Sequence, residues 1–142
     1  MARGEQAHSV DAKGRYIVPS KFRDALGERF IITIGLDDCL FVYTMQEWAV
    51  FEEKIKNISV FDPAARKFVR VFFGKSHEAE VDSQGRVLLP QNLREYAKIQ
   101  KDIVSIGVPG RIEIWAKELW NEYNGDISYD NGIAERMAEL GI

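Results

Sequence analysis

The chain has 142 residues, 46% hydrophobic and 29% charged, with a net charge of −3; this indicates one ordinary globular domain and disfavours nucleic-acid binding unless cations cluster locally. No apolar run reaches the roughly 18 residues of a membrane span, and the first six residues lack the apolar segment of a secretion signal. The single cysteine, Cys39, excludes an internal disulfide, so we expect a cytoplasmic protein.

Helix and strand signals alternate along the first half of the chain, so we expect an α+β fold. In chain order, the sequence predicts a turn at 11–14, a strand at 15–18, a short helix between Pro19 and Gly27, and a hairpin with strands at 30–35 and 39–43. Two helices follow. Thr44-Met-Gln-Glu47 is a capping box that opens the first, and Asp62-Pro63 supplies the N-cap and first residue of the second.

The large apolar residues of these two helices recur at helical spacing. They are not interleaved with a basic run, as a platform for stacking bases would be. We therefore interpret the aromatic members as core residues, namely Trp48, Phe51, Phe61, Phe68 and Phe72.

The second half of the chain predicts the same order of elements. Strands at 103–107 and 111–115 flank a Pro-Gly turn, a polar helix begins near Lys117, and an amphipathic helix lies within 126–142. With no flexible linker between the halves, we expect one integrated domain.

A stretch of fourteen residues occurs twice. Residues 10–23 return as residues 81–94, with Val, Asp, Gly, Arg, Pro and Arg identical in register about 71 positions later. Such duplicated units usually bury their apolar faces against each other in one pseudo-symmetric body. We divide the chain into a first repeat at 5–48, a helical connection at 49–76, a second repeat at 77–120 and a helical tail at 121–142.

The recurring unit is Asp-x-x-Gly-Arg, followed by Pro. Glycine permits the positive φ of a tight turn, and the aspartate can accept backbone N–H groups or pair with the arginine four positions later. We expect a structural role for Asp11, Gly14, Pro19, Asp82, Gly85 and Pro90.

Cations cluster in these repeats without neighbouring acids. Residues 12–23 contain four cations and no acid, and residues 83–94 contain two arginines and no acid. A guanidinium fork suits both phosphate oxygens and the guanine edge, so these side chains are candidate DNA contacts. They are Lys13, Arg15, Lys21, Arg23, Arg86 and Arg94; the alternatives are a solvated charged face and, for Arg94, a brace within the fold.

Signatures of catalysis are absent from the sequence. Two histidines and one cysteine give no metal-binding set, and the chain contains no phosphate-cradling glycine loop and no nucleophile elbow. We expect no enzyme, no metal, no cofactor and no small-molecule substrate.

The motif Val-Asp-x-x-Gly-Arg-x-x-x-Pro-x-x-Phe-Arg resembles the swapped-hairpin DNA-binding module of AbrB-type bacterial regulators. Two tandem copies of it, together with Gly35-Leu-Asp-Asp-Cys-Leu40 and Arg111-Ile-Glu-Ile-Trp115, are similar to the MraZ family. The resemblance covers nearly the whole chain.

This resemblance implies two SpoVT/AbrB-like repeats that form one double-psi-like β-barrel, assembled into ring-shaped homo-oligomers. It implies a nucleoid-associated transcriptional regulator that binds direct repeats in double-stranded promoter DNA, upstream of the bacterial division and cell-wall gene cluster. The DNA-facing arginine of the family falls on Arg15, with Arg86 as its counterpart. The basic position after the helix falls on Arg23 and Arg94, and Arg3 is a further basic candidate near the start.

A second hypothesis is a non-DNA oligomeric interaction module, or an antitoxin-like module, on the same barrel. The low isoelectric point of about 5.5 and an exposed apolar pair, Phe72-Phe73, motivate it. It predicts association that is insensitive to salt, whereas DNA binding weakens steeply as salt rises.

Overall fold

The computed structural model describes residues 3–125 and 132–142. Within these ranges the chain forms an α+β fold built on a mostly antiparallel sheet, as the sequence predicts. The first half contains β1 (Gly4–Ser9), β2 (Arg15–Ile17), α1 (Ser20–Leu26), β3 (Arg29–Ile34), β4 (Leu40–Thr44), α2 (Met45–Ile55) and α3 (Pro63–Gly74). The second half contains β5 (His77–Glu80), β6 (Arg86–Leu88), α4 (Gln91–Tyr96), β7 (Asp102–Val108), β8 (Arg111–Ala116), α5 (Lys117–Asn124) and α6 (Ile133–Glu139).

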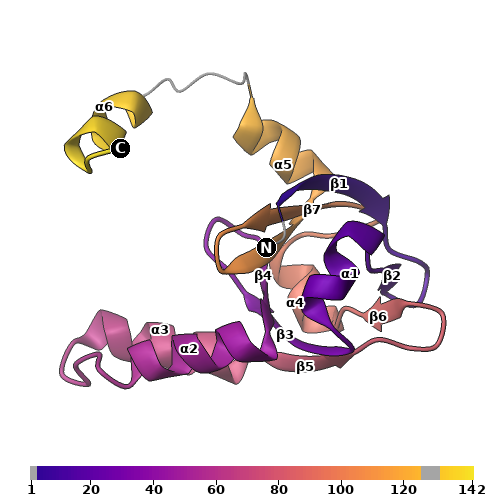
Figure 1. Ribbon diagram of the computed structural model, residues 1–142, viewed down its shortest axis with the longest axis horizontal. Helices are drawn as coiled ribbons and strands as arrows, with labels where there is room; N and C mark the ends of the chain where they lie inside the picture. The colour runs from indigo at the N-terminus through magenta and orange to yellow at the C-terminus, as the bar shows by residue number, and fades with distance from the viewer. Residues whose placement is uncertain (1–2, 126–131) are drawn as a thin grey trace.

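The strands of the two repeats are interleaved. The large sheet has the order β1-β7-β8-β4-β3-β5, and β2 pairs with β6 in a separate two-stranded ribbon (Figure 1). The first strand of each repeat therefore pairs with the third strand of the other repeat, as β1 with β7 and β5 with β3. Because each half completes its hydrogen bonding with the other, the duplicated sequence forms a single body.

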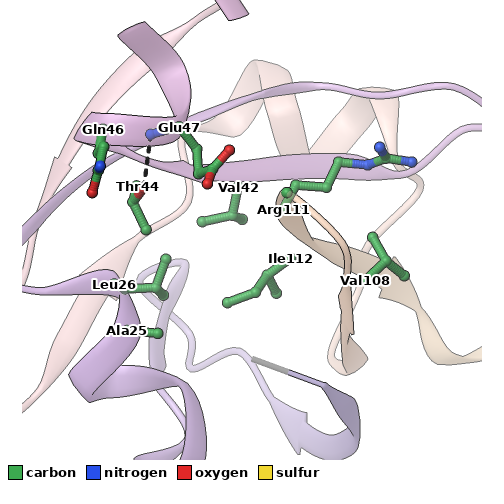
Figure 2. Close-up of a pocket in the computed structure, with 10 residues that line it drawn as sticks. Ala25, Leu26, Val42, Thr44, Gln46, Glu47, Val108, Arg111 and Ile112 are labelled. Carbon is green, nitrogen blue, oxygen red and sulfur yellow. Dashed lines mark hydrogen bonds between the residues drawn. The ribbon is translucent and has the colours of Figure 1, made fainter. Parts of the chain in front are cut away.

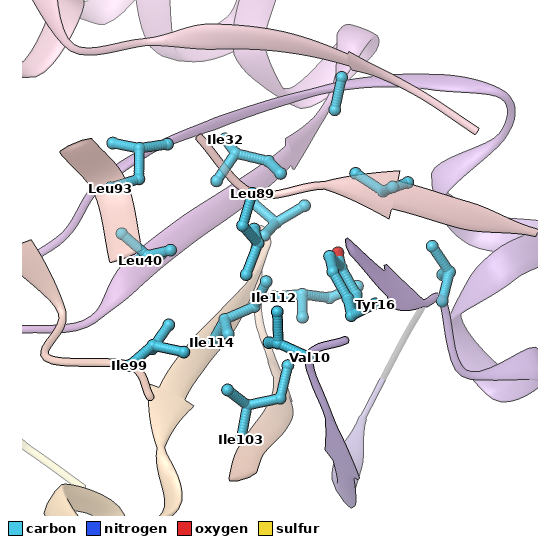
Figure 3. Packing of buried hydrophobic residues seen from close by; sticks show 14 of the residues in the cluster. Val10, Tyr16, Ile32, Leu40, Leu89, Leu93, Ile99, Ile103, Ile112 and Ile114 are labelled. Carbon is cyan, nitrogen blue, oxygen red and sulfur yellow. The ribbon is translucent and has the colours of Figure 1, made fainter. Parts of the chain in front are cut away.

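Both repeats contribute to one inner core. Figure 3 shows Val10, Tyr16 and Ile32 from the first repeat beside Leu89, Ile103 and Ile114 from the second. All six of these side chains are buried. Truncating such a side chain typically costs about 2–5 kcal/mol, so this shared packing adds to the strand pairing in holding the two halves together.

The register reveals a pseudo-twofold axis between the repeats. Tyr16 pairs with Val87 at the centre of β2–β6, and Phe41 pairs with Glu113 at the centre of β4–β8. Each pair joins equivalent strands of the two repeats, so the axis passes through both residue pairs. Figure 1 shows β2 and β6 on one side of the molecule and the α2–α3 hairpin on the other. The ribbon and the helical arm thus occupy opposite ends.

The helix starts follow the sequence signals. The Thr44 hydroxyl accepts the Glu47 backbone N–H at 2.9 Å, which begins α2. The Asp62 carboxylate accepts the backbone N–H groups of Ala64 and Ala65 at the start of α3. Both predicted caps are confirmed. The final helix covers Ile133–Glu139, and the rest of its predicted range at 126–131 lies outside the described residues.

Two predictions about aromatic residues are wrong: that Phe61 is a core residue, and that the Phe72-Phe73 pair is exposed. Phe61 is 87% exposed instead of buried, because it precedes the N-cap of α3. The residue that would pack against it in a hydrophobic staple is Arg66, which is not apolar. Phe72 is only 2% exposed, and Phe73 packs against Trp48 with ring centroids 5.0 Å apart. The Phe72-Phe73 pair therefore belongs to a second core between α2, α3 and the sheet, with Phe72 buried and Phe73 partly buried.

Candidate nucleic-acid interface

The turn before β2 is organised by one carboxylate. Asp11 Oδ1 accepts the backbone N–H groups of Lys13 and Arg15, each at 2.9 Å, and Asp11 Oδ2 accepts Nε of Arg15 at 2.9 Å. The hydrogen bond from the Arg15 backbone N–H is the main cause that lowers the pKa of Asp11 below its ordinary value. Gly14 completes the turn with φ of 83°. The carboxylate thus shapes the turn and orients the arginine.

The turn before β6 repeats this geometry. Asp82 accepts the backbone N–H of Gln84 at 2.9 Å, the backbone N–H of Arg86 at 2.8 Å and Nε of Arg86 at 2.8 Å. The pKa of Asp82 is lowered by the same main cause, the backbone N–H of its arginine. Gly85 has φ of 79°. The pseudo-twofold axis therefore relates two braced arginines.

The β2–β6 ribbon presents these arginines on its outer face. Tyr16 and Val87 point into the core, so their neighbours along each strand point outward. Both Arg15 and Arg86 have 28% of the side chain exposed. Each guanidinium bonds to its aspartate through Nε alone, and neither terminal Nη group is held by a hydrogen bond to another described residue.

Two aliphatic residues share this face and were missed by the sequence analysis. Ile17 lies opposite Arg86 and is 60% exposed, and Leu88 lies opposite Arg15 and is 49% exposed. The alternation of strand side chains could have revealed them, because a core position at Tyr16 places its neighbour at position 17 on the outside. The outer face therefore combines two guanidinium groups with two aliphatic side chains.

The structure separates the sequence cluster at 12–23. Arg94 donates from Nε to the Leu89 carbonyl at 2.9 Å, and a Cβ on Gly14 would lie 2.7 Å from its Cζ. Arg23 lies over Gly85 in the equivalent way and donates to the Val18 carbonyl at 3.4 Å. The structure corrects the expectation that these arginines follow the helix, because Arg23 lies within α1 and Arg94 within α4. Each packs on the turn of the other repeat.

This exchange redistributes the charge around the ribbon. The turn at 11–14 has Lys13 beside Arg15 and Arg94, whereas the turn at 82–85 has Gln84 beside Arg86 and Arg23. A hollow of about 340 Å³ at the second turn is also lined by Asp24 and Glu28. The end of the ribbon at 11–14 is therefore the more positive one.

The remaining basic candidates lie near the first strand. Lys21 extends over Gly4, where a Cβ would meet its Nζ at 2.9 Å, and its ammonium also lies 5.6 Å from the Phe22 ring centroid. Arg3 precedes Gly4 in the chain and is exposed. Lys21 and Arg3 thus meet at the start of β1.

A pocket of about 220 Å³ lies between α1, the start of α2 and the β7–β8 hairpin. Figure 2 shows Leu26, Val42 and Ile112 directed into it, while the guanidinium of Arg111 points away. That guanidinium lies 4.0 Å from the Phe41 ring centroid and donates to Glu113. The volume is below the range typical of small-molecule sites, and the ribbon remains the stronger candidate.

Residues 3–125 and 132–142 contain no group of three or more histidine, cysteine or acidic side chains that could hold a metal ion. They also contain no helix long and apolar enough to cross a membrane.

Comparisons with known proteins agree with the duplication. The family described as "MraZ protein, putative antitoxin-like" matches residues 1–71 and again 72–139. The chain is 57% identical over 140 residues to "Transcriptional regulator MraZ" of Clostridium tetani, with 98% of both chains covered. It is 54% identical over 143 residues to the protein of the same name from Acetivibrio thermocellus, and 56% identical over 144 residues to that from Caldicellulosiruptor bescii, with full coverage in both cases.

Proposed function

Because the chain belongs to the MraZ family, we propose that it is a transcriptional regulator that binds promoter DNA sequence-specifically through the outer face of the β2–β6 ribbon. The observation that carries the proposal is the pair of aspartate-braced arginines, Arg15 and Arg86, on that face. The major groove of B-DNA admits a two-stranded β-ribbon. An enzymatic role has no support in the family description or in the names of the relatives.

The braces suit direct readout of a base. Asp11 and Asp82 bond to Nε and leave the two Nη groups of each arginine without a hydrogen-bond acceptor among the described residues. Such a fork pairs with O6 and N7 of guanine, with about 1–3 kcal/mol of discrimination for each good pair. Ile17 and Leu88 would contact thymine methyl groups beside it.

The surrounding cations would fix the register on the backbone. Lys13 at the first turn is exposed, as are Lys21 and Arg3 near β1. Contacts of this kind to phosphates position a protein without reading sequence. Arg23 and Arg94 hold the turns, and through them the reading face, so we assign them a bracing role with phosphate contact as a secondary one.

A net charge of −3 makes one copy a weak ligand for DNA. We therefore include a ring-shaped homo-oligomer in the proposal, because several ribbons on one rim would bind successive direct repeats with a raised effective concentration. The proposal includes operator repeats upstream of the division and cell-wall gene cluster, as the family resemblance implies. The protein would act in the cytoplasm, on the nucleoid.

The interleaved strands support a double-psi-like barrel made of two swapped-hairpin repeats. The pairings of β1 with β7, β5 with β3 and β2 with β6 all join one repeat to the other. We keep residues 5–48 and 77–120 as the two SpoVT/AbrB-like repeats, 49–76 as the connection and 121–142 as the tail of a single domain. The boundary at 48 falls within α2, which continues from the first repeat into the connection.

A binding assay with three arginine variants tests the proposal. Fluorescence anisotropy on a duplex selected from genomic fragments should show that Arg15→Ala abolishes specific binding, while Arg86→Ala weakens it less because its turn has fewer cations and more acids nearby. Arg29→Ala is the matched control, since Arg29 is an exposed arginine on β3 with a loose ion pair of 3.7 Å. Equal losses from the first two would refute the asymmetry, and unchanged binding by Arg15→Ala would refute the proposal.

The alternative, a non-DNA or antitoxin-like module, loses one of its two motives, the exposed Phe72-Phe73 pair, because Phe72 is buried. Salt dependence separates the two functions. DNA binding should weaken steeply between 50 and 200 mM salt, whereas an association through apolar surfaces should not.

A further inference from the structure

The two halves differ in how their equivalent helices are covered. α2 follows β4 and α5 follows β8, with Trp48 and Trp120 at matching positions. In the first half, α3 covers α2: Phe72 stacks on Trp48 with ring centroids 5.8 Å apart. In the second half, Tyr123 of α5 is 63% exposed. Among the residues that the structure describes, the surface that α3 protects on one half is thus open on the other.

The open surface is a groove with aromatic walls and an acidic rim. We call it the α5 groove; it has a volume of about 220 Å³ and is lined by Asp37, Asp38, Trp115, Leu119, Glu122 and Tyr123. The rings of Trp115 and Tyr123 lie 4.8 Å apart. Of the three acids, Asp38 has a long ion pair of 3.6 Å with the exposed Lys98. The lining residues themselves include no cation.

The loop between α2 and α3 presents a surface of the opposite charge. We call residues 58–61 the arm tip; its large side chains are Ile58, Val60 and Phe61, with exposed fractions of 40%, 66% and 87%. The loop is held in place, because Arg66 donates to the Val60 carbonyl at 2.9 Å and the Phe61 N–H donates to Ser59 Oγ at 3.2 Å. The apolar side chains are therefore presented by an ordered loop.

Cations lie on one side of the arm tip, and one of them, Lys56, pairs with Glu53 at 2.8 Å. A hollow of about 340 Å³ beside the arm tip is lined by Lys56, Arg66 and Arg70 together with apolar side chains, and none of its lining residues is acidic. The α5 groove has three acids and no cation in its lining. The two surfaces are complementary in charge, and each presents an exposed aromatic side chain, Phe61 at the arm tip and Tyr123 in the groove.

Resting on the self-association in the proposed function, we propose that the arm tip of one copy docks in the α5 groove of the next, with Phe61 as the anchor. The arm and α5 extend in different directions from the sheet (Figure 1), so both surfaces of one chain remain available to neighbours. A contact between two different patches is heterologous, and a heterologous contact closes into a ring when its rotation permits. An exposed aromatic entering an aromatic-lined hollow is typical of an interface hot spot.

Two single variants and a control test the contact by sedimentation velocity. Phe61→Ser and Tyr123→Ser should each change the assembled full-length protein into monomers. Val50→Ser should leave it assembled, because Val50 is an exposed aliphatic residue of α2 outside both surfaces. Circular dichroism should remain unchanged in all three, since each altered side chain is largely exposed.

Mixing the variants gives the sharper test. Phe61→Ser keeps an intact groove and Tyr123→Ser keeps an intact tip, so an equimolar mixture should form one-to-one dimers and nothing larger. An assembled Phe61→Ser protein would overturn the proposal. Dissociation by Tyr123→Ser alone would overturn it too, because the groove would then hold another occupant, such as α6. Dimers absent from the mixture would also count against it.

The same variants distinguish a failure of this contact from a failure of the proposed function. Monomeric Phe61→Ser should keep wild-type affinity for a duplex with one box and lose the added affinity for several boxes, because only the linkage is removed. Loss of single-box binding in Arg15→Ala would then still support DNA recognition. A wild-type protein that stays monomeric would remove both the ring and this contact.

Discussion

The guanidinium of Arg94 lies against Gly14, although the two residues belong to different repeats. A Cβ on Gly14 would come within 2.7 Å of Arg94 Cζ, and the Gly14 carbonyl accepts the Leu89 N–H at 2.9 Å. Gly85 and Arg23 form the equivalent contact across the pseudo-twofold axis. Each arginine-bearing turn is thus supported by the helix of the other repeat, which makes the shape of the reading face a property of both halves.

Replacing Gly14 by alanine should destabilise the fold by about 1–3 kcal/mol. The residue has φ of 83°, which strains any L side chain, and the new Cβ would displace Arg94. Gly74→Ala is the control, because Gly74 lies in α3 with open space around it and alanine favours helix. Urea unfolding measures both. Equal midpoints for the two variants would contradict the steric argument.

Asp11→Asn should weaken specific DNA binding even though it removes a negative charge. Asn keeps the size of the side chain but loses the charged partner that holds Nε of Arg15. If Asp11 acted only by repelling phosphates, the variant would bind more tightly. Asp24→Asn, which removes an exposed acid beside the second turn, should bind slightly more tightly and so provides the comparison in the same anisotropy assay.

Gln84→Lys should increase affinity by giving the second turn the cation that Lys13 gives the first. One added phosphate contact steepens the dependence of log Kobs on log salt by about 0.9 on B-DNA. Lys13→Gln should flatten it by the same amount, without a change in preferred sequence. Titration at several salt concentrations measures the slopes, and unchanged slopes would place both positions away from the backbone.

Ile17→Ser and Leu88→Ser should reduce discrimination between sites with and without thymine at the contacted positions. Both side chains lie on the exposed face of the ribbon, 60% and 49% exposed, so stability should change by less than about 1 kcal/mol. Val50→Ser serves again as an exposed aliphatic control. Competition with altered duplexes provides the measurement, and equal competition curves for all three proteins would exclude apolar base contacts.

The protein should lose stability as pH falls from 6.5 to about 4, in part through His8. Burial lowers the pKa of His8 from 6.5 to about 4, and its Nε2 lies 2.8 Å from Ser105 Oγ. In this window the unfolded chain binds a proton that the folded chain does not, so unfolding becomes more favourable. His8→Gln should show a smaller loss between pH 7 and 4.5 in urea unfolding. A loss equal to that of the wild type would assign the effect to the carboxylates.

The sequence by itself determined the local chemistry. The Asp-x-x-Gly-Arg turns form because Asp11 bonds to groups only two and four residues away, at Lys13 and Arg15. The caps at Thr44 and Asp62 are equally local. Interactions of this range depend on residue type and spacing alone, so the pattern was sufficient to predict them. The two tandem copies of the motif also indicated the family.

Only the tertiary structure decided which of these residues meet. It assigned Arg23 to the turn of the second repeat, placed Ile17 and Leu88 beside the braced arginines, and left Phe61 exposed while burying Phe72. These outcomes depend on strands about 71 positions apart pairing across a pseudo-twofold axis. Such pairing is fixed by the burial of a shared core, to which both repeats contribute, and no short segment of the chain contains that information.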